Sequence, residues 1–246
     1  MSDQPTTLYG DQPEAPRPQA PGLLDQIIGA FTSPVELFQK LNKAPSWGWA
    51  LGALVVGAVI LSVIWGLKVD MDEMLRPILE KNPQLSASQI DAAVGFYRKF
   101  IIPLGIFQSI FMIGLIVFLM ALIYWLVGKG MAEAERPTYR QALSATVVPG
   151  LVRLPYLVLI GLICLVKPIG GLTPEKIAPT SLGYFIQVDN VKLHALLYCL
   201  DLFFFAECLL LFLAMRHLLR LKTSGAAICV AISVLLGVGF RVLGAK

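Results

Sequence analysis

The chain has 246 residues, of which 57% are hydrophobic and only 15% charged, and its mean hydropathy is +0.73. Soluble domains carry charged residues at about a quarter of their positions, so a soluble globule of this composition would expose large apolar patches and is excluded. The net charge of +4, from 20 basic and 16 acidic residues without a basic run, excludes a nucleic-acid-binding protein. The composition predicts an all-α, polytopic integral membrane protein whose partner is the lipid bilayer.

The first 46 residues are expected to lie outside the bilayer core. Residues 1–22 contain five prolines and almost no aliphatic residues, which predicts a disordered tail. Residues 23–46 show two apolar stripes at helical spacing, which predicts amphipathic helices in the membrane interface. A soluble helix packed on a loop is the alternative. The stripes are Leu23, Leu24, Ile27, Ile28 and Phe31, then Val35, Leu37, Phe38 and Leu41.

A helix start is predicted between the two stripes. Ser33 is the expected N-cap, Pro34 occupies the first helical position, and Glu36 is placed to reach back and complete a capping box. Together with the tail, this N-terminal region is the expected site for binding a protein partner.

Five apolar blocks are each long enough to cross the bilayer, because about 20 helical residues span its ~30 Å hydrocarbon core. The third block is interrupted by Pro149, Arg153 and Pro155. The predicted spans, within a membrane domain of residues 47–246, are 47–67, 103–127, 143–166, 193–215 and 226–243.

Long connections follow the first and third spans. Ser86 offers a cap for a helix that begins near residue 87 and continues into the second span. Residues 68–85 are predicted to form a broken helical loop, and residues 167–192 an irregular loop. Within the latter, the apolar run 181–186 is a candidate to dip back towards the membrane.

The orientation is predicted from the distribution of Lys and Arg, which are more abundant on the cytoplasmic side. The two sides hold nearly equal numbers, but Arg216, Arg220 and Lys222 are concentrated in one short loop without acidic residues. This loop lies on the same side as the N-terminus, which also shows no secretory signal. We therefore expect a cytoplasmic N-terminus and, in a bacterial cell, insertion in the cytoplasmic membrane.

Charged residues at bilayer depth are costly and normally face the bundle interior, where they find a partner. Arg153 and Glu207 lie at similar predicted depths, ~15 Å and ~12 Å from the cytoplasmic ends of their spans, which predicts an ion pair. Asp201 lies about two turns further along and shares a helical face with His194. These four residues form either a pathway for a proton, ion or anionic substrate, or a packing device that docks the two spans.

No catalytic or cofactor-binding signature is present. The chain lacks a phosphate-binding loop, an H-E-x-x-H motif and a G-x-S-x-G elbow. His194 and His217 lie at opposite ends of one predicted span, so a histidine metal site is not expected. We therefore expect neither an enzyme nor a cofactor. The four cysteines lie in apolar blocks, which favours inert thiols over disulfides: Cys164, Cys199, Cys208 and Cys229.

Several short motifs resemble the membrane domain of the Yip family (Ypt/Rab-GTPase-interacting proteins), in its bacterial form. They are FTSPVELF at 31–38 before tryptophans that open the first span, ALSATVVP at 142–149, PTSLG at 179–183 and LDLF at 200–203. The resemblance covers residues 27–243 and implies a five-span bundle with a cytosolic N-terminus. Eukaryotic relatives are partners of small GTPases, but their Asp-Leu-Tyr-Gly-Pro signature is absent near the first span, so no GTPase-binding residue is carried over.

These observations favour a non-enzymatic membrane protein that organises partners or the local bilayer through its N-terminal region. The alternative is a small transporter or channel-like subunit built around Arg153, Asp201 and Glu207. Close-packing spacings such as Gly48-x-x-x-Gly52 are compatible with either packing within the chain or an oligomer.

Overall fold

The computed structural model describes residues 19–133 and 135–245. The regular structure of these residues is helical, with isolated β-bridges and no strand, which confirms the all-α class. Residues 1–18 of the predicted tail lie outside the described residues. The elements are α1 (Leu23–Thr32), α2 (Pro34–Lys43), α3 (Gly48–Lys68), α4 (Met71–Leu79), α5 (Ala87–Met131), α6 (Tyr139–Val147), the 3-10 helix η1 (Val148–Arg153), α7 (Leu154–Val166), α8 (Pro174–Ile177), α9 (Leu182–Phe185), α10 (Val191–Cys199), α11 (Leu202–His217) and α12 (Thr223–Gly244).

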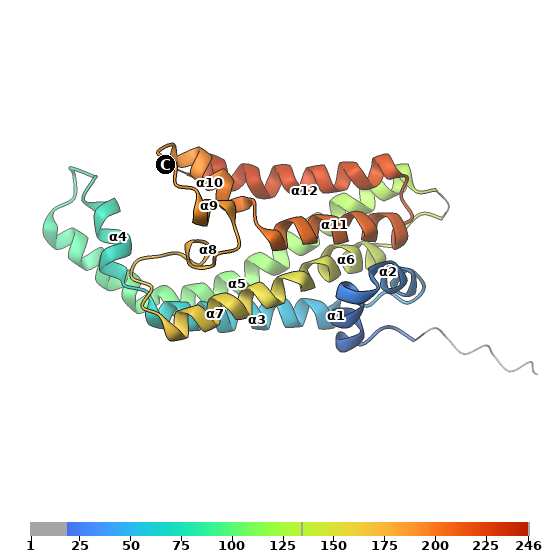
Figure 1. Ribbon diagram of the computed structural model, residues 1–246, viewed down its shortest axis with the longest axis horizontal. Helices are drawn as coiled ribbons and strands as arrows, with labels where there is room; N and C mark the ends of the chain where they lie inside the picture. Colours follow the sequence, from blue (N-terminus) through green and yellow to red (C-terminus); the bar gives the residue numbers. More distant parts are fainter. Residues whose placement is uncertain (1–18, 134, 246) are drawn as a thin grey trace, which may run out of the picture.

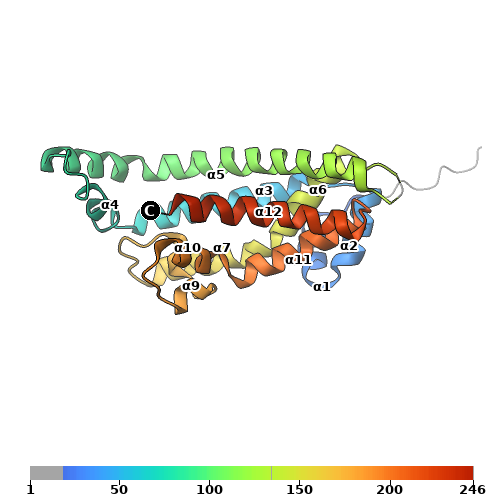
Figure 2. The same ribbon diagram turned by 90° about the horizontal axis from the view of Figure 1, so that it is seen from above.

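The helices form an elongated bundle with α1 and α2 at one end and α4 at the other (Figure 1). Four continuous helical stretches are long and apolar enough to cross a membrane: α3, α5, the run from α6 through η1 to α7, and α12. This confirms the polytopic membrane fold. Figure 2 shows α5 extending beyond the other helices at the α4 end, as expected for 45 residues that rise about 1.5 Å each.

The predicted helix that leads into the second span is present. The hydroxyl of Ser86 accepts a hydrogen bond from the backbone N–H of Gln89, whose side-chain oxygen accepts one from the N–H of Ser86 at 2.8 Å. These two bonds form a capping box, which satisfies donors that the first helical turn leaves free. Because α5 then continues without a break, its first turns project beyond the span together with α4.

The third span is interrupted where the sequence predicts it. Residues 148–153 form the 3-10 helix η1 between α6 and α7. Pro149 lies in the first turn of η1 and Pro155 in the first turn of α7. Proline has no N–H to donate and its ring obstructs the preceding turn, so the two prolines disfavour a regular α-helix here. Arg153 is the last residue of the tightened segment.

The predicted fourth span, 193–215, is wrong as a single helix. The helix ends at Cys199 and a new one begins at Leu202, because the carboxylate of Asp201 accepts a hydrogen bond from the N–H of Phe204 at 2.6 Å and so caps α11. Aspartate competes with the backbone in this way and therefore favours helix starts over helix interiors. A hydropathy window does not register such a cap.

The backbone groups freed by this break are satisfied by the preceding loop. The N–H of Leu182 donates to the carbonyl of Leu200 at 3.0 Å, and the N–H of Leu202 donates to the carbonyl of Thr180 at 3.2 Å. The segment predicted to dip back, 181–186, contains the short helix α9 and packs against α10 in this position. Broken helices are tolerated at membrane depth where protein supplies such partners.

Despite the break, α10 and α11 together connect the two ends of the bundle. At one end, the side-chain amide of Asn42 on α2 donates to the carbonyl of Leu218, just after α11, at 2.6 Å. At the other end, α10 lies beside the last turns of α12 (Figure 1), and His194 of α10 and Arg241 of α12 line one pocket. The chain therefore passes along the bundle in α3, α5, α6–α7, α10–α11 and α12.

The predicted capping box before α2 is not formed. Pro34 does begin α2 and Ser33 is its N-cap, but the Ser33 side chain makes no capping hydrogen bond. Ser33 is also the C-cap of α1, which ends at Thr32, and its N–H donates to the carbonyl of Gly29 at 3.0 Å. Because Ser33 is the single residue between two helices, both helices constrain its backbone, and the capping geometry is not reached. Glu36 therefore has no capping role.

The two N-terminal helices differ in their environment. Phe38 and Leu41 of α2 are completely buried in the main core cluster, which also contains residues of α6 and α11. The helix α2 is thus packed on protein, whereas α1 exposes Leu24, Ile28 and Phe31. Only α1 keeps the apolar surface that an interfacial helix requires.

Candidate functional site

Arg153 and Glu207 form an ion pair between η1 and α11, as their predicted depths indicate. The guanidinium of Arg153, at the end of η1, donates from Nε to Oε2 of Glu207 on α11, and its Nη2 contacts the same oxygen. The side chains keep 45% and 25% of their surface exposed. An unpaired charge in a membrane span is costly, and the ion pair gives each of these two residues a partner.

The close approach of three elements places this pair. A Cβ atom added at Gly150 of η1 would lie 3.1 Å from a methyl carbon of Leu54 on α3 and 3.9 Å from Oε1 of Glu207. Glycine at this position therefore lets α3 and α11 pack closely on η1 and brings the carboxylate within reach of Arg153.

Asp201 does not join the ion pair. Its carboxylate caps α11, and its backbone forms an antiparallel bridge with Ser181. The hydroxyl of Ser181 is buried and has no hydrogen-bond partner among the described residues. The role that the geometry gives Asp201 is to start α11 and to hold the loop that precedes α10.

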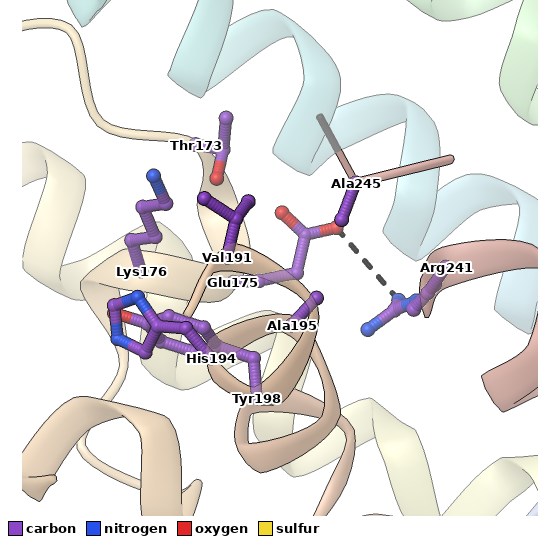
Figure 3. Close-up of a pocket in the computed structure, with 9 residues that line it drawn as sticks. All are labelled: Thr173, Glu175, Lys176, Val191, His194, Ala195, Tyr198, Arg241 and Ala245. Atoms are coloured by element: carbon purple, nitrogen blue, oxygen red, sulfur yellow. Dashed lines mark ion pairs between the residues drawn. The ribbon is translucent and has the colours of Figure 1, made fainter. Parts of the chain in front are cut away.

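His194 lines a separate pocket of about 300 Å³ (Figure 3), in the half of the bundle that carries α4 (Figure 1). Its Nε2 is 3.3 Å from the carbonyl oxygen of Gly183, and its ring packs against Tyr198 with centroids 4.9 Å apart. Glu175 and Arg241 form an ion pair across the pocket at 3.7 Å. The helix break between His194 and Asp201 ends the shared helical face that an unbroken helix would have given them.

The four polar candidates therefore occupy three places: a central ion pair, a helix cap and a pocket at one end. In the central ion pair, the guanidinium of Arg153 and the carboxylate of Glu207 bind each other. Among the described residues, no group of three or more His, Cys, Asp or Glu side chains has a spacing that would hold a metal ion.

Two polar contacts between spans were not predicted. The hydroxyls of Tyr124 on α5 and Ser233 on α12 form a hydrogen bond, and those of Ser62 on α3 and Ser109 on α5 form another at 3.0 Å. Such bonds join membrane helices where hydrophobic attraction between them is absent. The signal in the sequence is the presence of single hydroxyl residues in otherwise apolar spans, but it does not indicate which residues pair.

Comparison with known proteins identifies one relationship. The Yip1 domain matches residues 28–244, which is nearly the whole chain and confirms the resemblance seen in its motifs. Neither the curated proteins nor the solved structures contain a significant match.

Proposed function

Because the chain belongs to the Yip1 domain family and is a multi-pass membrane protein, we propose that it is a non-enzymatic organiser of the bilayer around it. In this proposal α1 inserts its apolar stripe into one leaflet while α2 and the spans hold it in place. The observation that carries the proposal is an exposed apolar stripe on a helix that is fixed to the bundle.

The inner face of α1 is anchored by Gln26, which is completely buried. Its side-chain amide donates to the carbonyl of Pro21 at 2.9 Å and to the hydroxyl of Ser46 at 3.2 Å. Ser46 is followed directly by Trp47, the N-cap of α3, and Trp49 lies in the first turn of that helix. Indole rings favour the membrane interface. The anchor thus supports an interfacial level for α1.

The outer face of α1 is apolar. Leu24, Ile28 and Phe31 are 72%, 60% and 50% exposed, and their spacing places them on one side of the helix. A stripe at the interface is covered most simply by lipid, and its insertion enlarges one leaflet relative to the other. A protein partner bound to the same stripe is the other outcome to be tested.

Insertion is tested by tryptophan quenching in reconstituted vesicles that contain brominated lipids. A Phe31→Trp variant is expected to show quenching beyond that of the wild type, with the strongest effect from bromines near the headgroup end of the acyl chain. Lys81→Trp, at an exposed position in the loop after α4, is the matched control and should add no quenching. Unquenched emission at Phe31→Trp would refute insertion.

The organising role is tested by measuring the mean diameter of vesicles that contain the reconstituted protein. The wild type should reduce the mean vesicle diameter at equal protein-to-lipid ratio, and a Leu24→Ser/Ile28→Ser/Phe31→Ser variant should lose this effect while it elutes as the wild type in gel filtration. Equal diameters for the two proteins would contradict the role. Capture of a protein by the wild type alone, without any change in the vesicles, would favour partner binding instead.

The alternative, a transporter or channel-like subunit, is supported by one feature: both segments that carry the central ion pair are interrupted beside it, in η1 and before α11. It requires water at the pair. Cys208, adjacent to Glu207, is partly exposed and should then react with a small membrane-impermeant thiol reagent in native membranes. A Cys208 that reacts only after denaturation would exclude a hydrated path.

A further inference from the structure

A basic pocket of about 260 Å³ lies at the end of the bundle that carries α2. Its cations come from three segments that are distant in the sequence: Lys43 at the end of α2, Arg136 in the α5–α6 connection and Arg220 in the α11–α12 turn. Among the described residues that line it, Glu135 is the one acid. Figure 1 shows these three segments meeting at the end opposite α4.

The walls of the basic pocket are fixed by hydrogen bonds. The side-chain amide of Gln141 donates to the carbonyl of Asn42 at 2.8 Å, and the side chain of Asn42 donates to the carbonyl of Leu218 at 2.6 Å. On the opposite wall, the N–H of Glu133 donates to the carbonyl of Arg220 at 2.9 Å. The cations therefore converge on a preformed cavity, so little ordering cost remains on binding.

The charges of this pocket are available to a ligand. Lys43, Arg136 and Arg220 are exposed, and none of them has an acidic partner within 4.0 Å in residues 19–133 and 135–245. The neighbouring Arg216 differs, because it is paired with Glu133 at 2.7 Å. Three cations against one acid give the pocket a preference for an anion.

The position of the pocket indicates which anion it meets. Tyr139 directly follows the pocket residue Thr138, and its ring packs edge-on against Trp125, with centroids 6.1 Å apart. The ammonium of Lys129 lies 3.5 Å from the centroid of the same indole ring. Tyrosine, tryptophan and lysine gather where the acyl chains meet the headgroups. The pocket therefore opens close to the level of lipid phosphates.

We propose that the basic pocket binds the phosphate group of an anionic phospholipid. Guanidinium groups donate paired hydrogen bonds to phosphate oxygens, and lysine adds a point charge. Basic pockets between membrane helices are suited to such headgroups. The proposal is independent of the insertion of α1, since it concerns other residues and depends on lipid charge rather than on vesicle shape.

The test measures binding of a fluorescent phosphatidylglycerol to the full chain in neutral detergent. A Lys43→Gln/Arg136→Gln/Arg220→Gln variant should bind about a hundredfold more weakly, which corresponds to roughly fivefold for each charge removed. The matched control, Lys81→Gln/Lys167→Gln/Lys192→Gln, removes the same charge from exposed positions outside the pocket and should bind as the wild type. A phosphatidylcholine probe should bind weakly to all three proteins.

Three further results would contradict binding of a lipid phosphate in the basic pocket. Equal weakening in both triple variants would overturn it, because binding would then follow net charge alone. If inorganic phosphate binds more tightly than the lipid, the ligand of the pocket is free phosphate and not a lipid headgroup, which would overturn the proposal. If the triple pocket variant fails to fold, the Glu135→Gln variant provides the test instead. Removing this acid should strengthen binding of the anionic lipid roughly fivefold, and unchanged lipid binding would overturn the proposal.

Discussion

The ion pair of Arg153 and Glu207 is the residue-scale feature that the sequence predicts best. Both residues lie in long apolar runs, and counting 1.5 Å per residue from the ends of those runs places them at similar depths. No comparable rule predicts that Tyr124 bonds to Ser233, because a hydroxyl group tolerates many partners and water. Charged side chains, which are rare in membrane spans and destabilising when unpaired, can therefore be paired from the sequence more easily than the commoner hydroxyl groups.

A double-mutant cycle tests what the pair contributes. Arg153→Leu or Glu207→Leu alone leaves an unpaired charge and should reduce the free energy of unfolding by roughly 1–3 kcal/mol, less than the 3–5 kcal/mol of a fully buried pair because Arg153 is partly exposed. The double variant should lie within about 1 kcal/mol of the wild type. Thermal unfolding in detergent measures this, and losses that simply add would show that the two side chains are not coupled.

At the scale of elements, hydropathy predicts the long helices but not where they break. The apolar blocks 47–67, 103–127 and 226–243 correspond to α3, to part of the longer helix α5 and to α12. The break before α11 depends on Asp201 and on backbone partners from a loop about twenty residues earlier. Such a contact is set by tertiary structure, and a window moved along the sequence cannot detect it.

The prediction of a capping box at Ser33 and Glu36 is wrong for a related reason. The motif is typical of an isolated helix start, but α1 ends at the residue before Ser33, and this preceding helix determines the backbone conformation of Ser33. The same four-residue logic succeeds at Ser86, where only a loop precedes the helix. A capping motif therefore predicts its hydrogen bonds reliably only when no other helix abuts it.

The packing of α4 on α5 is expected to weaken in acid. Arg76 donates to Asp72 at 2.9 Å and to Asp91 at 2.8 Å, and Arg98 also contacts Asp72. The hydrogen bond from Arg76, aided by the charge of Arg98, holds the pKa of Asp72 below its usual 3.8. A lowered pKa stabilises the folded state above about pH 3.8, and this contribution is lost as the pH falls below that value.

Hydrogen exchange of the α4 amides, corrected for intrinsic rates, measures this effect. Protection should decrease below pH 3.8 in the wild type, whereas Asp72→Asn should already be less protected at pH 6 and lose little more in acid. Asp189→Asn, at an exposed position in another loop, is the control and should follow the wild type. An unchanged α4 in the Asp72→Asn variant would mean that the ion pairs do not hold it.

For the whole molecule, the question is whether the broken fourth segment crosses the membrane. The contact of Asn42 with the residue after α11 and the pocket shared by α10 and α12 lie at opposite ends of the bundle, so we predict that it does. In a Cys208→Ala background, whose remaining cysteines are buried, Lys192→Cys and Lys222→Cys should therefore react with an impermeant thiol reagent from opposite sides of sealed vesicles. With the predicted cytoplasmic N-terminus, intact cells should label only Lys192→Cys. Labelling of both from one side would mean that α10 and α11 enter and leave by the same face, and that the chain crosses an even number of times.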